Sequence, residues 1–216
     1  MKIIKYSLGQ LQTNCYFIVE DNQCIIIDPA DEAGFILEEL QRRKLKLVGI
    51  LATHGHFDHL LAVGEIQRSI DISLYLSKKD LFLIDRLEET VKHFLGYKPT
   101  TLPIKNIKNF VIENSLKIGN FKLKIIPSPG HTPGGVCYYL PAEASAKAGL
   151  PILFSGDTLF KQGIGRYDFS YCNKDDLKHS LKKILLLPKD TVVYPGHGEK
   201  TTVAEEKKNF PNFLVS

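Results

Sequence analysis

A dense group of histidines constrains this sequence more than any other feature. Residues 53–59 read Thr-His-Gly-His-Phe-Asp-His, so three imidazoles and one carboxylate occupy six positions directly after the apolar run 47–52. Imidazole nitrogen and carboxylate oxygen together suit zinc, iron or manganese, and alternating positions can turn two side chains toward one ion. The alternative is a polar loop whose histidines cap backbone groups. The density of ligand types favours a metal site.

Three further candidate ligands stand singly, each after a predicted strand. His131 lies in a proline- and glycine-rich segment, which predicts a rigid, irregular loop, whereas Asp157 and His197 each follow an apolar run. Each of them is ambiguous alone. However, five of the seven histidines follow predicted strands, and this pattern points to one shared site. The other two fall in predicted helices, where we expect them to face solvent: His93 and His179.

The remaining pattern predicts alternating strands and helices. Strands are predicted at 1–8, 14–19, 24–28, 47–52, 72–76, 121–126, 136–140, 151–155 and 191–194. Helices are predicted at 33–44, 60–70, 78–95 and 174–187. Asp21 and Asn22 indicate a hairpin turn, Asp31 is the expected cap of the first helix, and 96–109 is expected to be a loop. Residues 54–59 would then lie on a loop at the C-terminal end of a strand, where α/β folds usually carry their chemistry.

Composition limits the classes of function. The 216 residues contain no flexible or charged linker, so we expect one domain spanning residues 1–216. No apolar run approaches the roughly 20 residues that span a bilayer, and the N-terminus lacks signal-peptide features, so we expect a cytoplasmic protein without a membrane partner. A net charge of +4 without a basic run argues against nucleic-acid binding and is compatible with a small anionic substrate. The four cysteines form no Cys-x-x-Cys pair, which argues against a zinc ribbon or a redox dithiol.

These motifs together resemble those of the metallo-beta-lactamase-fold hydrolases, and most closely the short, single-domain members of the glyoxalase II (hydroxyacylglutathione hydrolase) group. The resemblance covers nearly the whole chain. It implies an α/β fold, a four-layer αβ/βα sandwich of two facing mixed sheets with outer helices and with metal ions at one edge. It also implies which residues bind metal: one ion is held by His54, His56 and His131, the other by Asp58, His59 and His197, with Asp157 bridging both and Asp28 in a structural role.

The expected chemistry follows from such a site. Two divalent ions, with zinc expected and iron or manganese as alternatives, can share a water and lower its pKa from about 15.7 toward 7. We expect the resulting metal-bridging hydroxide to attack a glutathione-type thioester such as S-lactoylglutathione, because a thiolate leaves without a strong general acid. Asp58 is the expected catalytic residue, since it would hydrogen-bond the hydroxide and orient it.

Substrate recognition is expected in the glycine-containing segment 161–168. In glyoxalase II relatives the matching segment helps to hold glutathione. The resemblance therefore implies that Arg166 pairs with a substrate carboxylate and that Tyr167 packs or hydrogen-bonds nearby. A local salt bridge between Arg166 and Asp168 is the equally weighted alternative. The segment after His197 is much shorter than the C-terminal helical domain of full-length glyoxalase II, which is why the resemblance is to the short members.

Three other functions fit parts of the same pattern. A persulfide dioxygenase shares the fold and motifs but uses one iron, which His54, His131 and Asp157 would bind. A lactonase or other ester hydrolase needs the same activated water and differs only in its pocket. A non-catalytic metal-binding module predicts decay of the ligand set, and the complete set of seven candidate ligands argues against it.

Overall fold

A computed structural model describes residues 1–109, 115–142 and 149–210. The strands of the first half are β1 (Lys2–Leu8), β2 (Thr13–Glu20), β3 (Gln23–Ile27), β4 (Lys46–Leu51), β5 (Leu74–Leu76) and β6 (Ile107–Asn109). Those of the second half are β7 (Leu116–Ile118), β8 (Phe121–Pro127), β9 (Val136–Leu140), β10 (Ile152–Gly156), β11 (Leu159–Phe160), β12 (Gly163–Ile164), β13 (Val192–Pro195) and β14 (Thr201–Thr202). The helices are α1 (Ala33–Arg42), α2 (Phe57–Leu60), α3 (Val63–Ser69), α4 (Leu81–Asp85), α5 (Leu87–Leu95), α6 (Lys174–Leu185) and α7 (Val203–Asn209), with a 3-10 turn, η1, at Lys78–Asp80.

Two mixed sheets are formed from these strands. Among the described residues the first sheet has the order β1-β2-β3-β4-β5-β6 and the second the order β14-β13-β10-β9-β8-β7. In the second sheet β10 runs parallel to β13 and antiparallel to β9, which is antiparallel to β8, so β8, β10 and β13 all point the same way. Their C-terminal ends therefore reach one edge of the sheet. The loops that follow these ends carry three of the predicted ligands.

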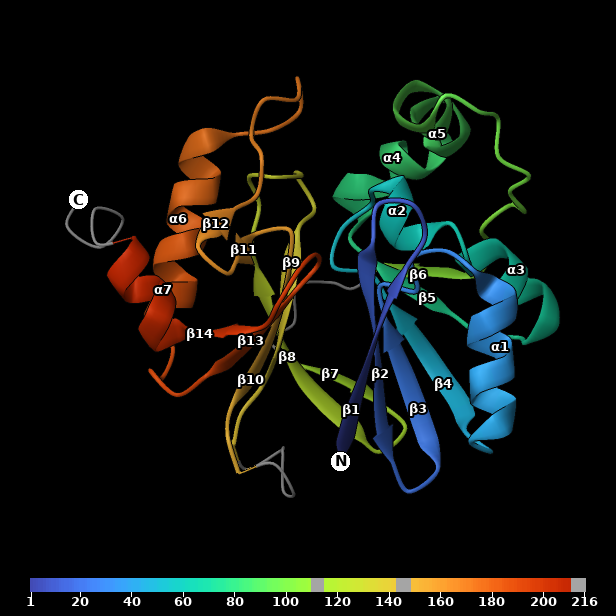
Figure 1. The fold of residues 1–216 in the computed structure, drawn as a ribbon, viewed down its shortest axis with the longest axis horizontal. Helices are drawn as coiled ribbons and strands as arrows, with labels where there is room; N and C mark the ends of the chain where they lie inside the picture. Colours follow the sequence, from blue (N-terminus) through green and yellow to red (C-terminus); the bar gives the residue numbers. More distant parts are fainter. Residues whose placement is uncertain (110–114, 143–148, 211–216) are drawn as a thin grey trace.

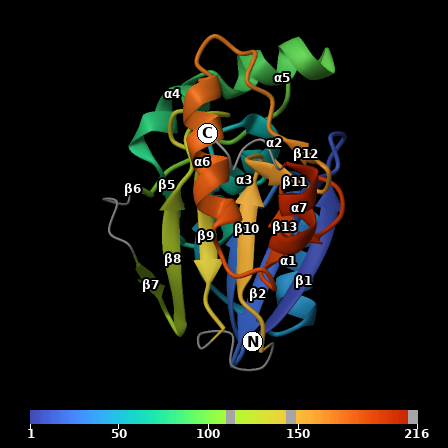
Figure 2. The ribbon, with the colours of Figure 1, turned by 90° about the vertical axis from the view of Figure 1, so that its left-hand side faces the viewer.

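The layers follow from the side-chain alternation of the strands. On β2, Tyr16 and Ile18 face a core between the two sheets, whereas Cys15 and Phe17 face a second core beneath α1 and α3. On β9, Tyr138 likewise faces the core between the sheets, and its neighbours face a third core beneath α6 and α7. Because each sheet is apolar on both faces, each needs a sheet on one side and helices on the other. The predicted four-layer αβ/βα sandwich is confirmed (Figures 1 and 2).

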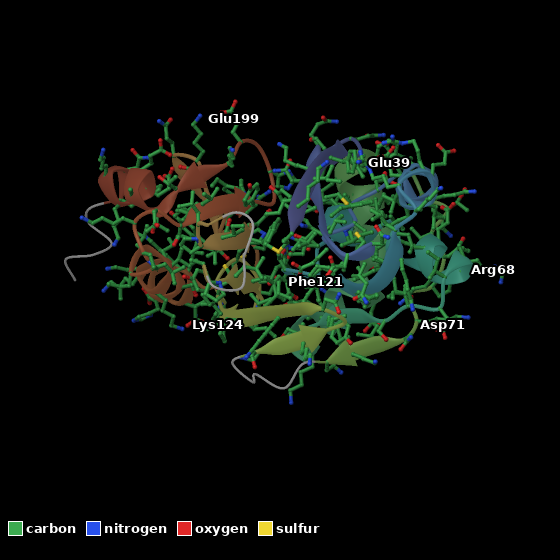
Figure 3. All side chains as sticks on the ribbon, turned by 90° about the horizontal axis from the view of Figure 1, so that it is seen from below. Glu39, Arg68, Asp71, Phe121, Lys124 and Glu199 are labelled. Carbon is green, nitrogen blue, oxygen red and sulfur yellow. The ribbon has the colours of Figure 1, made fainter. Side chains whose placement is uncertain are left out.

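The view from the end opposite the metal-ligand loops shows how the side chains divide between interior and surface. Phe121, which is 2% exposed, lies in the middle of the molecule among the core between the sheets (Figure 3). The labelled charged residues Arg68, Asp71 and Glu199 lie at the periphery (Figure 3). None of the helices in the described ranges combines the length and the apolar character that a membrane-spanning helix requires.

Most predicted elements are present, including the hairpin turn. Asp21 and Asn22 both adopt positive φ, at 46° and 62°, which is the backbone of a two-residue turn that matches the strand twist. The expected cap at Asp31 is wrong. The side chain of Asp31 accepts a hydrogen bond from the backbone N–H of Glu32, and Glu32 occupies the N-cap position in a left-handed conformation. Asp31 therefore lies one residue too early to cap α1.

Three other differences concern element boundaries. The helix expected at 60–70 is divided into α2 and α3, and α2 already begins at Phe57, so Asp58 and His59 lie on a helix and not on a loop. The helix expected at 78–95 is interrupted at Arg86, whose φ of −103° and ψ of 9° are not helical. Apolar periodicity could not detect this break because Leu83 and Leu87 keep helical spacing across it. The predicted loop 96–109 contains β6, which at three residues is too short for an alternating pattern.

Candidate metal centre

The seven predicted ligands come from segments that meet at one end of the two sheets. His54 and His56 lie between β4 and α2, and Asp58 and His59 lie on α2. The other three follow the ends of β8, β10 and β13: His131, Asp157 and His197. Together the seven side chains form three overlapping groups, in each of which the potential ligand atoms all lie within 4.8 Å of one another. The structure thus brings together every residue named as a ligand from the sequence, and metal binding by them stays a prediction.

Three imidazoles form the first group. Nε2 of His54 lies 3.0 Å from Nδ1 of His56, and Nε2 of His131 lies 3.1 Å from the same atom. Neutral imidazole has one N–H and one lone pair, so three ring nitrogens that face one another cannot all be satisfied by hydrogen bonds among themselves. A cation that accepts all three lone pairs resolves this arrangement.

The second group joins α2 to the loop after β13. Oδ2 of Asp58 lies 3.5 Å from Nε2 of His59 and 3.2 Å from Nε2 of His197. Asp157 lies between these two groups, and together with His54 and His59 it forms the third group. Its Oδ1 is 3.4 Å from Nε2 of His59, and its Oδ2 is 3.6 Å from Nε2 of His131 and 3.7 Å from Nε2 of His197. One carboxylate therefore reaches both groups.

The outward nitrogen of every imidazole has a polar neighbour, and for His54, His56, His131 and His197 this contact is a hydrogen bond. The contact of Nδ1 of His59 with Asp28 is a close ion-pair contact without hydrogen-bond geometry. The neighbours are the hydroxyl of Thr53 for His54 (3.0 Å), the hydroxyl of Tyr171 for His56 (2.8 Å), the carboxylate of Asp28 for His59 (3.0 Å), the carbonyl of Arg166 for His131 (2.8 Å) and the carbonyl of Leu11 for His197 (3.1 Å). The hydroxyl of Thr53 donates to Asp28 at 2.7 Å, so it is left to accept from the Nδ1–H of His54. Outer partners of this kind fix the ring tautomer and orientation in metal sites.

The donor set fits a metal ion by a direct structural test. Nε2 of His59 and Oδ1 of Asp157 are buried and have no hydrogen-bond partner. Buried polar atoms are nearly always partnered, and leaving one unpartnered costs about 1–3 kcal/mol. Both atoms point into the centre, where a divalent ion would satisfy them. Nitrogen and oxygen ligands in this number suit zinc, and they also suit iron or manganese.

The pKa shifts of His54, His56 and Asp157 favour the protonation states that bind a cation. Burial, followed by the neighbouring imidazoles, holds the pKa of His54 well below its ordinary value, and burial and His131 lower the pKa of His56 to about 3. Burial raises the pKa of Asp157, but the imidazoles around it, His59 first, lower it more, so this pKa lies below its usual value. Burial lowers the pKa of His59, but the surrounding carboxylates, Asp58 first, raise it more, so a metal ion that binds this ring must displace a proton. Neutral imidazoles and ionised carboxylates are the states that metal ligands require.

A glycine is needed where the second sheet closes over the site. A Cβ on Gly196 would lie 2.1 Å from Oδ1 of Asp157 and 2.8 Å from Cε1 of His59, which real side chains do not tolerate. The Pro-Gly-His sequence at 195–197 thus lets the backbone pass directly over two of the predicted ligands. Its signal was present in the sequence as a glycine immediately before a candidate histidine.

Asp80 is a supporting residue outside the motifs that predict the site. It is fully buried at the end of η1, and its Oδ2 accepts from the backbone N–H of Gly55 at 3.0 Å and from the hydroxyl of Thr132 at 2.7 Å. Its Oδ1 accepts from the backbone N–H of Gly134 at 2.6 Å. One carboxylate therefore joins the loop of His54 to the loop of His131. No local pattern identifies it, because its partners lie on other segments.

The start of β2 supports the second group in a similar way. The hydroxyl of Thr13 donates to Oδ2 of Asp58 at 2.8 Å. The amide of Asn14 donates to the carbonyls of Pro195 at 2.9 Å and Gly198 at 3.0 Å, on both sides of His197. The signal for these residues in the sequence is a polar pair at the beginning of an apolar strand.

A cavity of about 250 Å³ opens over the centre. Five of the predicted ligands line it, together with Arg166 and these uncharged residues: Leu11, Phe57, Thr90, Phe94, Phe169 and Tyr171. Arg166 makes the local salt bridge considered as the alternative, because its Nε and Nη2 each lie 2.7 Å from an oxygen of Asp168. Tyr167 is not among the lining residues. It is 43% exposed, with the ammonium of Lys174 5.6 Å from its ring centroid.

Comparison with known proteins agrees with this arrangement. The family profile of the metallo-beta-lactamase superfamily matches residues 8–197, which include the whole set of seven predicted ligands. The chain belongs to the metallo-beta-lactamase superfamily. It is 34% identical to a hydroxyacylglutathione hydrolase, GloC, of Haemophilus influenzae over 95% of this chain and 94% of that protein. The resemblance inferred from the motifs is thereby confirmed.

Solved structures place the chain within the same superfamily. It is similar to BLEG-1, described as a B3 metallo-beta-lactamase, with 36% identity, a TM-score of 0.86 and complete coverage of both chains. It is also similar to TTHA1623 in a di-iron-bound form, with 32% identity, a TM-score of 0.83 and coverage of 95% of this chain and 98% of that one. Members of the superfamily are metallo-hydrolases that bind divalent metals, often two, and the clusters found here are in keeping with that property.

Proposed function

We propose that this protein is a binuclear metal-dependent hydrolase of small thioesters, with glutathione-type thioesters such as S-lactoylglutathione as the reference class of substrate. The observation that carries the proposal is the position of Asp157, whose Oδ2 lies 3.6 Å from His131 in one group and 3.7 Å from His197 in the other. A carboxylate shared by two ligand groups is the arrangement expected for two adjacent ions. The likeness to GloC supports the substrate class.

The residues divide between the two ions as the resemblance implies. His54, His56 and His131 would hold one ion, and Asp58, His59 and His197 would hold the other, with Asp157 available to both. Zinc is the proposed metal, and the di-iron form of TTHA1623 supports iron as the second candidate. When bound, two such ions supply Lewis acidity toward a carbonyl and lower the pKa of water to about 7.

The protein groups orient the reactants in this proposal. Asp58 lines the cavity, and the hydrogen bond from Thr13 fixes its carboxylate, so that it can accept a hydrogen bond from the attacking water and orient it. Among the described residues that line the cavity there is no serine or cysteine to act as a nucleophile instead. A thioester suits this site because its thiolate departs without a strong general acid.

A second candidate reaction is hydrolysis of the amide of a β-lactam. The likeness to BLEG-1 favours it, since that protein is described as a B3 metallo-beta-lactamase and is similar along the entire chain. The same ligand set would serve both reactions, and the difference between them would come from the cavity.

A substrate panel tests the proposal directly. The protein is reconstituted with zinc, its metal content is measured by plasma mass spectrometry, and kcat/KM is determined for S-lactoylglutathione, a matched oxygen ester, a lactone and a β-lactam. We expect two metal ions per chain, the highest kcat/KM for the thioester, and loss of turnover on removal of metal with a chelator. Metal-loaded protein that hydrolyses the β-lactam or the lactone but no thioester would contradict the proposed substrate class. Oxygen uptake with glutathione persulfide in the iron-loaded protein would favour the dioxygenase.

A further inference from the structure

The cavity over the metal centre has an aromatic wall, defined here as Phe57, Phe94, Phe169 and Tyr171. Phe57 and Phe94 stack with their ring centroids 6.1 Å apart, and Phe94 meets Phe169 edge to face at 6.0 Å. Phe169 in turn stacks on Tyr171 at 5.4 Å. The wall therefore joins α2 and α5 of the first half to the connection between β12 and α6. Helix α5 and the connection between β12 and α6 stand on opposite sides of the end of the molecule that carries the metal-ligand loops (Figure 1).

Two large apolar side chains at the mouth of this cavity are unusually exposed. Phe94 is 45% exposed and Leu11 is 42% exposed, and both line the cavity. Apolar surface exposed beside a functional centre gains free energy when a ligand covers it. The end of the cavity that is lined by the predicted metal ligands is polar. A substrate that fills the cavity would therefore place its reactive carbonyl at this end and an apolar portion against the aromatic wall.

The cavity offers no free cation to an anionic substrate portion. Arg166 is the only lysine or arginine among the described residues that line it. Its guanidinium is bound by both oxygens of Asp168, each at 2.7 Å, and it lies over the ring of Phe169, 4.1 Å from the centroid. A substrate carboxylate would have to displace Asp168 from an ideal two-point contact. Arg166 thus extends the aromatic surface and does not add an anion site.

We propose that this cavity is a subsite for an uncharged apolar group, aliphatic or aromatic, attached to the carbonyl that is hydrolysed or to its leaving atom. The inference rests on the proposed hydrolase function and narrows its substrate class. Among glutathione thioesters it favours those with apolar acyl groups over lactoyl. Burying one methylene group contributes about 0.8 kcal/mol, which corresponds to about a fourfold gain in kcat/KM for each added methylene that reaches the wall.

The first experiment varies the acyl group on a constant neutral thiol. The zinc-loaded protein is assayed with the acetyl, butanoyl, hexanoyl, phenylacetyl and succinyl thioesters of N-acetylcysteamine. We expect kcat/KM to rise by at least about tenfold from acetyl to hexanoyl, and we expect the succinyl thioester to react more slowly than the butanoyl one. A second series keeps the acetyl group and varies the thiol from N-acetylcysteamine to benzyl mercaptan and glutathione. It shows which side of the scissile bond enters the cavity.

Variants tie the preference to the wall. Phe94→Ala, at a half-exposed position, should reduce the hexanoyl-to-acetyl ratio of kcat/KM by about fivefold or more, and Phe169→Leu should reduce it less. Tyr97→Ala is the matched control, because Tyr97 is similarly exposed, at 40%, but is not among the lining residues. This control variant should leave the ratio unchanged. An equal loss in Tyr97→Ala would overturn the assignment of the wall.

The outcomes separate this inference from the proposed function. If thioesters are hydrolysed with flat kcat/KM in both series, or if succinyl is preferred, the subsite is refuted and the hydrolase proposal stands. If no thioester is hydrolysed, the hydrolase proposal fails and the subsite is tested by calorimetry with phenylacetate and acetate on the zinc-loaded protein. Binding of phenylacetate at least about tenfold tighter than acetate, reduced in Phe94→Ala, would support the subsite, and equal affinities would overturn it.

Discussion

The first sheet and the second sheet supply the metal centre in different ways. The first supplies four of the seven side chains from six consecutive positions, at the end of β4 and on α2, whereas the second supplies one side chain from each of three loops that are far apart in the sequence. The spacing of the contiguous set is fixed by its own segment, and contacts from Asp28, Thr13 and Tyr171 orient its side chains. The dispersed set is positioned only by contacts with other elements, such as Asn14 on β2 and Asp80 on η1, which also binds the loop of His54. Removing one of these contacts should therefore weaken metal binding at one group of ligands and leave the other group intact.

The largest effect is expected from Asp58→Asn in the contiguous set. The amide keeps the shape and can still accept from Thr13, but it removes the charge that we assign to orienting the attacking water. We expect kcat to fall by at least about 100-fold with an unchanged circular dichroism spectrum. Asp71→Asn, at an exposed position on the first half, is the control. Full activity in Asp58→Asn would contradict the role proposed for this carboxylate.

Asp80→Asn should weaken the group that combines both sets, namely His54, His56 and His131. Both oxygens of this buried carboxylate accept hydrogen bonds, three in total. In asparagine one of the two oxygens is replaced by an NH2 group, which would face an N–H or O–H donor and could not accept from it. We expect zinc affinity at this group to fall by about 10–100-fold, as for other outer-shell partners of metal ligands. Titration of the metal-free protein with zinc against a chromogenic chelator measures the two binding steps, with the exposed Asp85→Asn as the control.

A second substitution shows which ion is affected. If Asp80 supports the first group, adding His197→Ala to Asp80→Asn should remove the remaining tight site, whereas adding His131→Ala should change little further. Changes that add independently in both double variants would show that Asp80 acts on the whole fold and not on one group of ligands.

Asn14→Ala should weaken the other group by a smaller factor. The alanine removes the amide donor from both carbonyls, but Tyr16 still donates to the carbonyl of Pro195 at 2.6 Å and Lys5 to the carbonyl of Gly198 at 3.1 Å. We expect zinc affinity at the group of Asp58, His59 and His197 to fall by about tenfold while the first group is unaffected. Asn120→Ala, at an exposed turn, controls for loss of an asparagine. A loss confined to the first group would reverse the comparison between the two sets.

The same contrast explains how much could be predicted from the sequence. The motif at 54–59 identified a metal site because its ligands are adjacent, whereas the expected order of the layers came from the resemblance alone, since β2 and β9 are apolar on both faces. Asp80 could not be found, because it acts on loops that are distant in the chain and close only after folding. Asn14 carried only the weak signal of a polar residue at the start of a buried strand. The exposed phenylalanine at 94 fitted a helical pattern equally well as core or surface residue, so its place in the cavity wall required the structure.

The smallest effect is expected from Tyr171→Phe, which separates two roles of one residue. The hydroxyl lies 2.8 Å from Nε2 of His56, whereas the ring stacks on Phe169 in the cavity wall. Removing only the hydroxyl costs one hydrogen bond, about 1 kcal/mol, so zinc affinity at the first group should fall by about fivefold. The preference for hexanoyl over acetyl thioesters should be unchanged, because the ring remains. A changed acyl preference with unchanged zinc affinity would show that the hydroxyl serves the substrate and that His56 is held in place by its own segment alone.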